Sequence, residues 1–250
     1  MWLVLCGADD LAALWAYQGL KARGLSPLEL VSDGALACAL RWEHRLGAGG
    51  PSTAVTLADG RTIRGDEIAG VLNRLLILPS GHMRAASPAD RDYAGQELVA
   101  FFTSWLYALP RPVLNRPTPQ GLCGRWRPVS EWVWMASRAG LPAPHYVRTM
   151  SGDGAENFAR RLAPQDASVM TAIVVAGRVV GASLPPDISE GCRRLARLAG
   201  TQLLGVEFYD GEAGPWTFAG ATPFPDLRLG GPALLGALAT ALQSGRTDAS

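Results

Sequence analysis

The chain opens with a strongly apolar run followed by an amphipathic stretch, a pattern that predicts a strand and then a helix. Trp2–Cys6 is apolar throughout and ends at Gly7, as a strand buried on both faces does. Leu11–Arg23 then carries apolar residues at helical spacing, and Leu28–Val31 returns to a strand pattern. We expect these segments to form a βαβ unit with parallel strands.

Shorter patterns follow, and they predict a small antiparallel sheet and one long helix. Ala39–Leu46 and Ser52–Leu57 alternate in part, and a turn precedes Thr62–Arg64. Ile68–Leu72 has the apolar character of another buried strand. Asp90–Leu109 has the clearest helical pattern, because its aromatic and aliphatic residues recur at three- and four-residue steps.

The second half of the chain predicts helices around two β-hairpins. Ser130–Ala139, Ala155–Ala163, Ile188–Ala199 and Pro232–Leu242 have helical patterns, and Thr171–Gly181 predicts the first hairpin. The second hairpin pairs two apolar runs, 203–208 and 216–219, across a glycine-rich turn. Its first strand contains a carboxylate, Glu207, and burying such a charge is costly unless it is paired or bound to a cation.

The sequence of the second hairpin resembles the metal-binding hairpin of ATP-grasp ligases, in their peptide-modifying and glutamate-ligase branch. The likeness rests on Gly-Val-Glu-Phe at 205–208 and Trp-Thr-Phe-Ala-Gly-Ala-Thr-Pro-Phe-Pro at 216–225. It implies that Glu207 occupies the acid position on the first strand. Gly220 stands where the family has a glutamate, and Thr222 stands where it has an asparagine. The resemblance therefore implies the frame of a Mg²⁺ and ATP phosphate site from which two of three metal ligands are missing.

The order of the predicted elements is also similar to that of ATP-grasp proteins. A helix, the run Ala-Gly-Leu-Pro-Ala-Pro at 139–144 and then a strand resemble the junction between the pre-ATP-grasp and ATP-grasp domains. The implied fold class is α/β, with a pre-ATP-grasp-like open sheet at 1–144 and a reduced ATP-grasp-like α+β domain at 145–250. Only about twenty residues, Arg148–Val169, stand where the family inserts its nucleotide-binding lobe, and the chain has a single lysine, Lys21. We expect a truncated domain that lacks this lobe.

A repeated tetrapeptide marks a candidate binding edge in the first half. Val-Leu-Asn-Arg occurs at 71–74 and again at 113–116, each time at a predicted strand end. Adjacent parallel strands would bring Asn73, Arg74, Asn115 and Arg116 to one edge of the sheet, where open α/β sheets bind ligands. The alternative is that each arginine pairs with a helix C-terminus or a local carboxylate.

Tryptophan and arginine gather in the stretch that follows. Four tryptophans, at positions 105, 126, 132 and 134, fall within about 30 residues, and arginines stand beside them. Tryptophan is frequent at interface centres, and arginine binds carboxylates bidentately. This region therefore predicts a peptide- or carboxylate-binding groove, with core packing as the alternative. Its candidate residues are Arg116, Arg125, Trp126, Arg127 and Trp132.

Composition narrows the classes of function further. The chain has a net charge of +1, so bulk electrostatics give no reason to expect a nucleic-acid partner. No apolar stretch approaches the roughly 20 residues of a membrane span, and we expect a cytoplasmic protein. The cysteines lie far apart and predict reduced thiols rather than a metal or redox site. The histidines have no obvious catalytic neighbour. The cysteines are Cys6, Cys38, Cys123 and Cys192, and the histidines are His44, His82 and His145.

Three hypotheses of function follow. The first is a catalytically reduced ATP-grasp-like protein that needs no cofactor and binds a peptide or a partner enzyme in a modification pathway, as a homo- or hetero-oligomer. The second is a compact ATP-dependent carboxylate–amine ligase that uses ATP and Mg²⁺. In it, Glu207 would share the metal with Asp210, Glu212 or Asp226, and arginines such as Arg160 or Arg161 would replace the family's lysines. The third is an unrelated small-molecule-binding or assembly protein.

Overall fold

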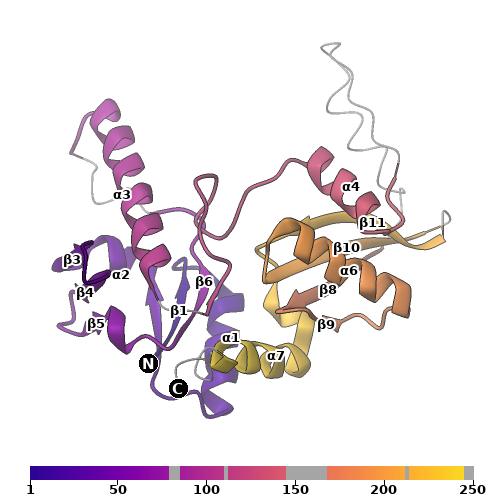
Figure 1. Ribbon diagram of the computed structural model, residues 1–250, viewed down its shortest axis with the longest axis horizontal. Helices are drawn as coiled ribbons and strands as arrows, with labels where there is room; N and C mark the ends of the chain where they lie inside the picture. Colours follow the sequence, from indigo (N-terminus) through magenta and orange to yellow (C-terminus); the bar gives the residue numbers. More distant parts are fainter. Residues whose placement is uncertain (79–84, 110–111, 145–167, 212–213, 245–250) are drawn as a thin grey trace. The chain divides into compact units, whose positions relative to one another are not determined.

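A computed structural model describes residues 1–78, 85–109, 112–144, 168–211 and 214–244, with side chains outside 210–215 (Figure 1). By contacts among its residues the chain divides into two compact units. The N-terminal unit comprises Met1–Trp126 with Leu238–Ser250, and the C-terminal unit comprises Arg127–Ala237. The domain boundary implied at residue 144 adjoins residues 145–167, which the structure does not describe. This boundary therefore stays a prediction.

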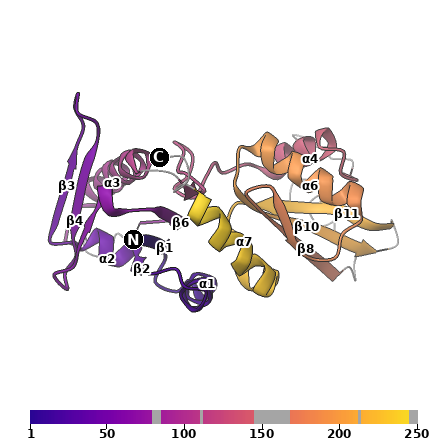
Figure 2. The same ribbon diagram turned by 60° about the horizontal axis from the view of Figure 1, so that its bottom comes forward.

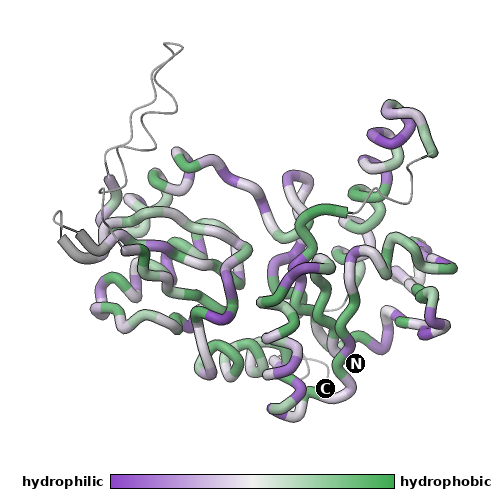
Figure 3. Tube along the Cα trace, turned by 180° about the vertical axis from the view of Figure 1, so that it is seen from behind, coloured by the Kyte–Doolittle hydropathy of each residue, from purple (hydrophilic) through white to green (hydrophobic). Residues whose placement is uncertain are grey.

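A four-stranded parallel sheet forms the centre of the N-terminal unit. Its strand order is β2 (Leu28–Ser32), β1 (Trp2–Cys6), β6 (Gly70–Arg74) and β7 (Val113–Leu114). Helix α1 (Leu11–Ala22) joins β1 to β2, which confirms the predicted βαβ unit. Every residue of β1 and β6 is buried, and these central strands trace hydrophobic segments in Figure 3. The uninterrupted apolar run of β1 follows from this burial on both faces.

A smaller antiparallel sheet and a long helix complete this unit. Strands β3 (Arg41–Arg45), β4 (Ser52–Thr56) and β5 (Thr62–Arg64) pair in that order, as the sequence predicts. Helix α3 (Pro88–Ala108) begins where the Ser87 hydroxyl accepts from Asp90 N, and it packs beside β3 and β4 (Figure 2). The contact is aromatic, because the Trp42 ring lies 5.0 Å from both Phe101 and Trp105. Short helix α2 (Asp33–Ala37) and turn η1 (Gly65–Glu67) connect the strands.

The C-terminal unit contains an antiparallel sheet of order β11 (Gly214–Thr222), β10 (Leu203–Gly211), β8 (Ser168–Val175) and β9 (Arg178–Gly181). The predicted hairpin of β8 and β9 is confirmed, and both turn residues have positive φ, 46° at Ala176 and 83° at Gly177. Helices α4 (Val129–Arg138) and α6 (Pro186–Ala199) cover one face of the sheet (Figure 2).

The last helix runs from one unit into the other. Turn η3 (Leu227–Gly230) lies against β8 and β9 and leads into α7 (Gly231–Gln243). The end of α7 belongs to the N-terminal unit, where Trp2 Nε1 donates to Leu242 O at 3.3 Å. No helix among the described residues is long and apolar enough to cross a membrane. The predicted helix Ala155–Ala163, with Arg160 and Arg161, lies outside the described residues, as do His82 and His145.

Candidate functional site

The hairpin of β10 and β11 places the three residues that the family resemblance singles out on one face of the sheet. Glu207 lies directly opposite Gly220, and Thr222 lies opposite Gly205. Because opposite residues share a face and faces alternate along a strand, the side chain of Glu207 and the positions of Gly220 and Thr222 point the same way. A Cβ built on Gly220 would lie 3.4 Å from Glu207 Oε2. A glutamate at 220 would thus stand beside the carboxylate of Glu207.

Two β-bulges set the direction of these side chains. The pairing register shifts after Glu207 and again after Tyr209, because Ala219 and Trp216 are extra residues on β11. Trp216 has φ of 77°, a left-handed conformation that bulky residues rarely adopt. The shifts keep Phe208 and Phe218 opposite each other in the core beneath α4 and α6. Glu207 therefore faces away from that core, at a bulge of the type that often adjoins functional sites.

Glu207 pairs with no acidic or basic side chain among the described residues. The residue is half-buried, and its neighbours in register are Thr171 on β8 and Gly220 on β11. It forms no hydrogen bond or ion pair with another described residue. Within the described ranges, no three side chains of histidine, cysteine, aspartate or glutamate gather to hold a metal ion. Among the described side chains, the site thus offers one carboxylate, where Mg²⁺ coordination in nucleotide sites usually uses carboxylates together with phosphates and water.

The remaining hairpin residues have structural roles. Thr222 Oγ1 accepts from Phe224 N at 3.1 Å, so this hydroxyl holds the turn that follows β11. Gly205 lies so close to this turn that a Cβ there would be 2.8 Å from Pro225 Cβ. Among the substitute metal ligands considered, Asp226 binds Arg228 through both of its carboxylate oxygens, at 2.9 and 2.7 Å. The side chains of Asp210 and Glu212 lie outside the described residues.

In the N-terminal unit, the two Val-Leu-Asn-Arg segments lie side by side. Strands β6 and β7 pair in parallel with Val71 opposite Val113, so both segments run in register toward the same edge of the sheet. Asn73 is fully buried there, and its Nδ2 donates to the carbonyl oxygens of Asn115 and Leu122 at 2.8 and 2.7 Å. The amide of Asn73 therefore joins the strand edge to the loop that carries Leu122.

The two arginines at this edge have local partners, which is the alternative that the sequence left open. Arg74 donates through Nε and Nη2 to the Asp10 carboxylate at 2.7 and 3.2 Å, and both side chains are buried. Asp10 also caps α1 by accepting from Ala13 N. Arg116 donates to the carbonyl oxygens of Tyr107 and Leu109 at the end of α3, at 3.0 and 3.1 Å. A ligand-binding role for these residues stays a prediction.

Two cysteines lie at the same edge, and their thiols are protonated at neutral pH. Cys123 Sγ donates to Asn73 O at 3.1 Å, and Asn115, whose φ is 60°, places its amide 4.0 Å from the same sulfur. Burial raises the pKa of Cys123 to about 12, and burial with nearby Asp10 raises the pKa of Cys6 to about 11. Because the thiolate is the nucleophilic form, neither cysteine is poised for nucleophilic catalysis.

The predicted tryptophan and arginine groove is divided between the two units. In the C-terminal unit, the Arg127 guanidinium lies 5.2 Å from the Trp132 ring centroid and donates to Glu131 and to Ala199 O. These contacts tie α4 to the end of α6, and Trp132 is buried. In the N-terminal unit, Arg125 and Trp126 are exposed. The convergence of these residues on one groove stays a prediction.

Sequence reasoning did not find some of the residues that define these two sites. The sequence gives no sign that Asp10 pairs with Arg74, 64 positions later, because this pairing depends on the parallel sheet. Thr171 became a neighbour of Glu207 only through the register of β8 on β10. The repeated tetrapeptide was the feature of the sequence that indicated the pairing of β6 with β7.

Solved structures provide the comparison with known proteins, since no protein-family model and no curated protein matches the sequence. Macrocyclase MdnC from Microcystis aeruginosa MRC, bound with precursor peptide MdnA, is similar at TM-score 0.70 and 13% identity, over 97% of this chain and 99% of that chain. A RiPP-associated ATP-grasp ligase from Chryseobacterium gregarium, in complex with ADP and a leader and core peptide, is similar at TM-score 0.70 and 11% identity, over 97% and 96%.

A third structure extends the likeness to another ligase. The ATP-grasp ligase PsnB, complexed with a variant of its minimal precursor, Mg and ADP, is similar at TM-score 0.69 and 18% identity, over 98% of both chains. The chain therefore has an α/β fold of the ATP-grasp type, and these structural neighbours are peptide-modifying ligases. The predicted α/β fold class and the likeness to ATP-grasp proteins are confirmed for the fold, whereas the predicted absence of the nucleotide-binding lobe concerns residues that are mostly outside the described ranges and stays a prediction.

Proposed function

We propose that this chain is a catalytically reduced ATP-grasp-like protein that binds a peptide or a partner enzyme in a peptide-modification pathway. The observation that carries the proposal is the single carboxylate of Glu207, facing Gly220 where a second metal ligand would stand. The peptide is proposed because MdnC and the Chryseobacterium ligase have structures with peptides bound. The fold is similar in all of them, and the family resemblance implies metal ligands at two positions where this chain has Gly220 and Thr222.

The loss of metal ligands is expected to abolish ligation because phosphoryl transfer depends on charge neutralisation. Metal ions and cationic side chains stabilise the charge that develops on the transferred phosphoryl group, and losing one such clamp costs orders of magnitude in rate. Gly220 has no side chain to bind a cation, and the Thr222 hydroxyl is a weaker ligand than a carboxylate or amide oxygen. With Glu207 as the one carboxylate among the described side chains of the site, most of the coordination would fall to solvent.

The C-terminal unit also lacks the lysines with which nucleotide sites bind ATP phosphates. The only lysine, Lys21, lies on α1 in the N-terminal unit, with its Nζ 5.7 Å from the Tyr17 ring centroid. The unit that carries the hairpin has no lysine to reach ATP phosphates as a point charge on a long stem. Its arginines on α6 have local partners: Arg193 and Arg197 bind Glu190, and Arg194 donates to Ala139 O.

Isothermal titration with Mg·ATP tests the catalytic part of the proposal. We expect no saturable heat up to millimolar nucleotide, and the matched variant Glu207→Gln should give the same trace. Micromolar binding that is lost in Glu207→Gln would overturn the proposal and support the compact ligase that uses ATP and Mg²⁺. A parallel ATP hydrolysis assay with a panel of carboxylate acceptors should stay at the background rate.

A second titration tests the binding part separately. The probe is a fluorescently labelled precursor peptide encoded beside the gene, or a full-length ligase encoded there. We expect a saturable change in anisotropy that does not depend on Mg²⁺ or ATP. Binding that requires Mg·ATP would contradict a reduced protein, and an absence of binding to either neighbour would contradict the pathway assignment while leaving the catalytic result intact.

A further inference from the structure

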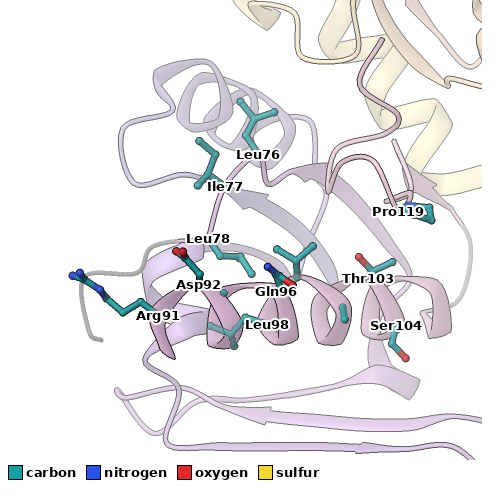
Figure 4. A pocket seen from close by; sticks show the side chains of 13 residues that line it. Leu76, Ile77, Leu78, Arg91, Asp92, Gln96, Leu98, Thr103, Ser104 and Pro119 are labelled. Carbon is teal, nitrogen blue, oxygen red and sulfur yellow. The ribbon is translucent and has the colours of Figure 1, made fainter. Parts of the chain in front are cut away.

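Large apolar side chains are exposed in both units, and the charges beside them differ. In the N-terminal unit, a groove of about 990 Å³ lies between α3 and the segment 76–78, and the charged residues that line it are the neighbouring Arg91 and Asp92, of opposite sign (Figure 4). In the C-terminal unit, Trp134 on α4 and Leu198 on α6 are 63% and 53% exposed, and arginines stand beside them. The surface around Trp134 and Leu198 therefore suits partners of one sign of charge.

Helices α4 and α6 pack against each other and are linked at both ends of α4 (Figure 1). Arg127 Nη2, just before α4, donates to Ala199 O at the end of α6 at 2.8 Å. Arg194 Nε donates to Ala139 O, just after α4, at 2.8 Å. The start of α4 thus lies near the end of α6, and the end of α4 lies farther back along α6. The two helices therefore run in roughly opposite directions.

This arrangement places two arginines side by side and two apolar side chains next to them. Arg138 directly precedes Ala139, whose carbonyl oxygen accepts from Arg194. Trp134 lies one helical turn before Arg138, and Leu198 lies one turn after Arg194. Because the helices run in opposite directions, both turns lead the same way, so the two apolar residues form a second tier beside the arginine tier. All four residues are exposed, and we call them the α4–α6 patch.

The positive charge of the patch exceeds the negative charge around it. Among the described residues, Arg138 has no ion pair, and Arg194 bonds to a carbonyl oxygen rather than to a carboxylate. The carbonyl end of α4 contributes about half a negative charge against these two full positive charges. Glu131 and Glu190 already bind other arginines, at 3.0 and 2.9 Å, and Asp187 lies about 10 Å from Arg194 along the axis of α6. A net positive potential therefore remains at the patch.

We propose that the α4–α6 patch binds an acidic helical segment of the peptide or partner enzyme of the proposed function. Carboxylates in one turn of that segment pair with Arg138 and Arg194, and apolar side chains in its next turn pack on Trp134 and Leu198. The spacing matches, because the two tiers of the patch are one helical turn, about 5.4 Å, apart. Guanidinium groups bind carboxylates through paired hydrogen bonds, and tryptophan is among the residues that contribute most to the free energy of binding at interfaces.

The kind of partner rests on the proposed function, and the patch adds the place and the charge through which this partner binds. The patch belongs to the helical layer of the C-terminal unit, whereas Glu207 faces away from the core beneath α4 and α6. Binding at the patch should therefore depend neither on Glu207 nor on Mg²⁺.

Fluorescence anisotropy with a synthetic peptide tests the site. The probe is a labelled, alanine-based helical peptide that carries glutamates in one turn and leucines in the next. We expect saturable binding to the wild type, weakened about tenfold or more in Arg138→Glu and in Trp134→Ala. The control Arg178→Glu makes the same charge reversal on β9, where Val179 packs against the core beneath α4 and α6 and Arg178 therefore points to the opposite face. This control should bind like the wild type, and circular dichroism melting checks that all variants are folded.

A wild type that does not bind the acidic peptide, or a patch variant that binds it as tightly as the wild type does, would overturn the proposal. Equal binding of a peptide with lysines in place of the glutamates would overturn it too. The labelled precursor peptide or ligase of the function test separates the two proposals. If it binds the wild type and Arg138→Glu with the same affinity, the patch is contradicted and the proposed function stands. Micromolar Mg·ATP binding would instead contradict the proposed function and leave the result for the patch unaffected.

Discussion

At the scale of single residues, the repeated Asn-Arg pairs show how much depends on partners that are distant along the chain. Arg74 and Asp10 are removed from water together, and their mutual pairing offsets the cost of burying each charge. Sequence alone left the choice between ligand binding and local pairing open, because the partner of Arg74 is distant along the chain. The parallel strands β1 and β6 bring the two together.

Breaking this buried pair should destabilise the protein strongly. Arg74→Met keeps much of the side-chain volume but leaves the Asp10 carboxylate buried without its guanidinium, which should cost about 3–5 kcal/mol in the free energy of unfolding. The control Arg228→Met breaks the exposed pair with Asp226 and should cost less than about 1 kcal/mol. Urea unfolding measures both. Equal losses in the two variants would contradict the role assigned to the buried pair, and Asp10→Asn combined with Arg74→Met should recover part of the loss.

His44 makes stability depend on pH. Its Nε2 lies 2.9 Å from Ser104 Oγ on α3, and burial lowers its pKa from the ordinary value of 6.5. The folded protein therefore binds this proton less readily than the unfolded chain. The stabilisation is complete above pH 6.5 and is lost as the pH falls toward the lowered pKa of the folded state. The difference in urea midpoint between the wild type and His44→Gln should shrink between pH 7.5 and 5.5, and a constant difference would contradict this role.

At the scale of elements, the alternation and spacing of apolar residues were sufficient to predict most strands and helices. The hairpin of β10 and β11 was predicted from two apolar runs and a glycine-rich turn. Its bulges at Trp216 and Ala219 were not, because a bulge changes the register without changing the composition of the strand. The direction of Glu207 relative to Gly220 depends on that register, so the geometry of the candidate site required the structure.

Substitution of two glycines, one in the hairpin and one in α7, should change stability in opposite directions. Gly205→Ala would place its Cβ 2.8 Å from Pro225 Cβ, and this overpacking should cost about 1–3 kcal/mol. Gly236→Ala, in α7, meets nothing within 4 Å and should instead stabilise the helix by about 1 kcal/mol. Thermal unfolding of the two variants should therefore shift in opposite directions. A Gly205→Ala protein as stable as the wild type would contradict the close packing of the segment 222–225 on β10.

At the scale of the whole molecule, the order of the elements along the chain was the main basis for predicting the ATP-grasp fold. The structural alignments span 97–98% of this chain and 96–99% of the three ligase chains at 11–18% identity. A fold is maintained by the many apolar positions of its cores, and these tolerate substitution when volume and pattern are kept. A metal site depends on a few particular side chains, so the proposed loss of two ligands, at positions 220 and 222, is compatible with this fold.

This separation predicts that metal binding and catalysis can be regained independently. In the double variant Gly220→Glu/Thr222→Asn, the new carboxylate stands beside Glu207, because a Cβ at 220 lies 3.4 Å from Glu207 Oε2. We expect this variant to bind Mn²⁺, detected by electron paramagnetic resonance, whereas the wild type and Gly220→Gln do not. ATP hydrolysis should nevertheless remain at background, because the only lysine, Lys21, lies in the N-terminal unit. Hydrolysis restored by these two substitutions alone would mean that the phosphate-binding part of the site is still present in the chain.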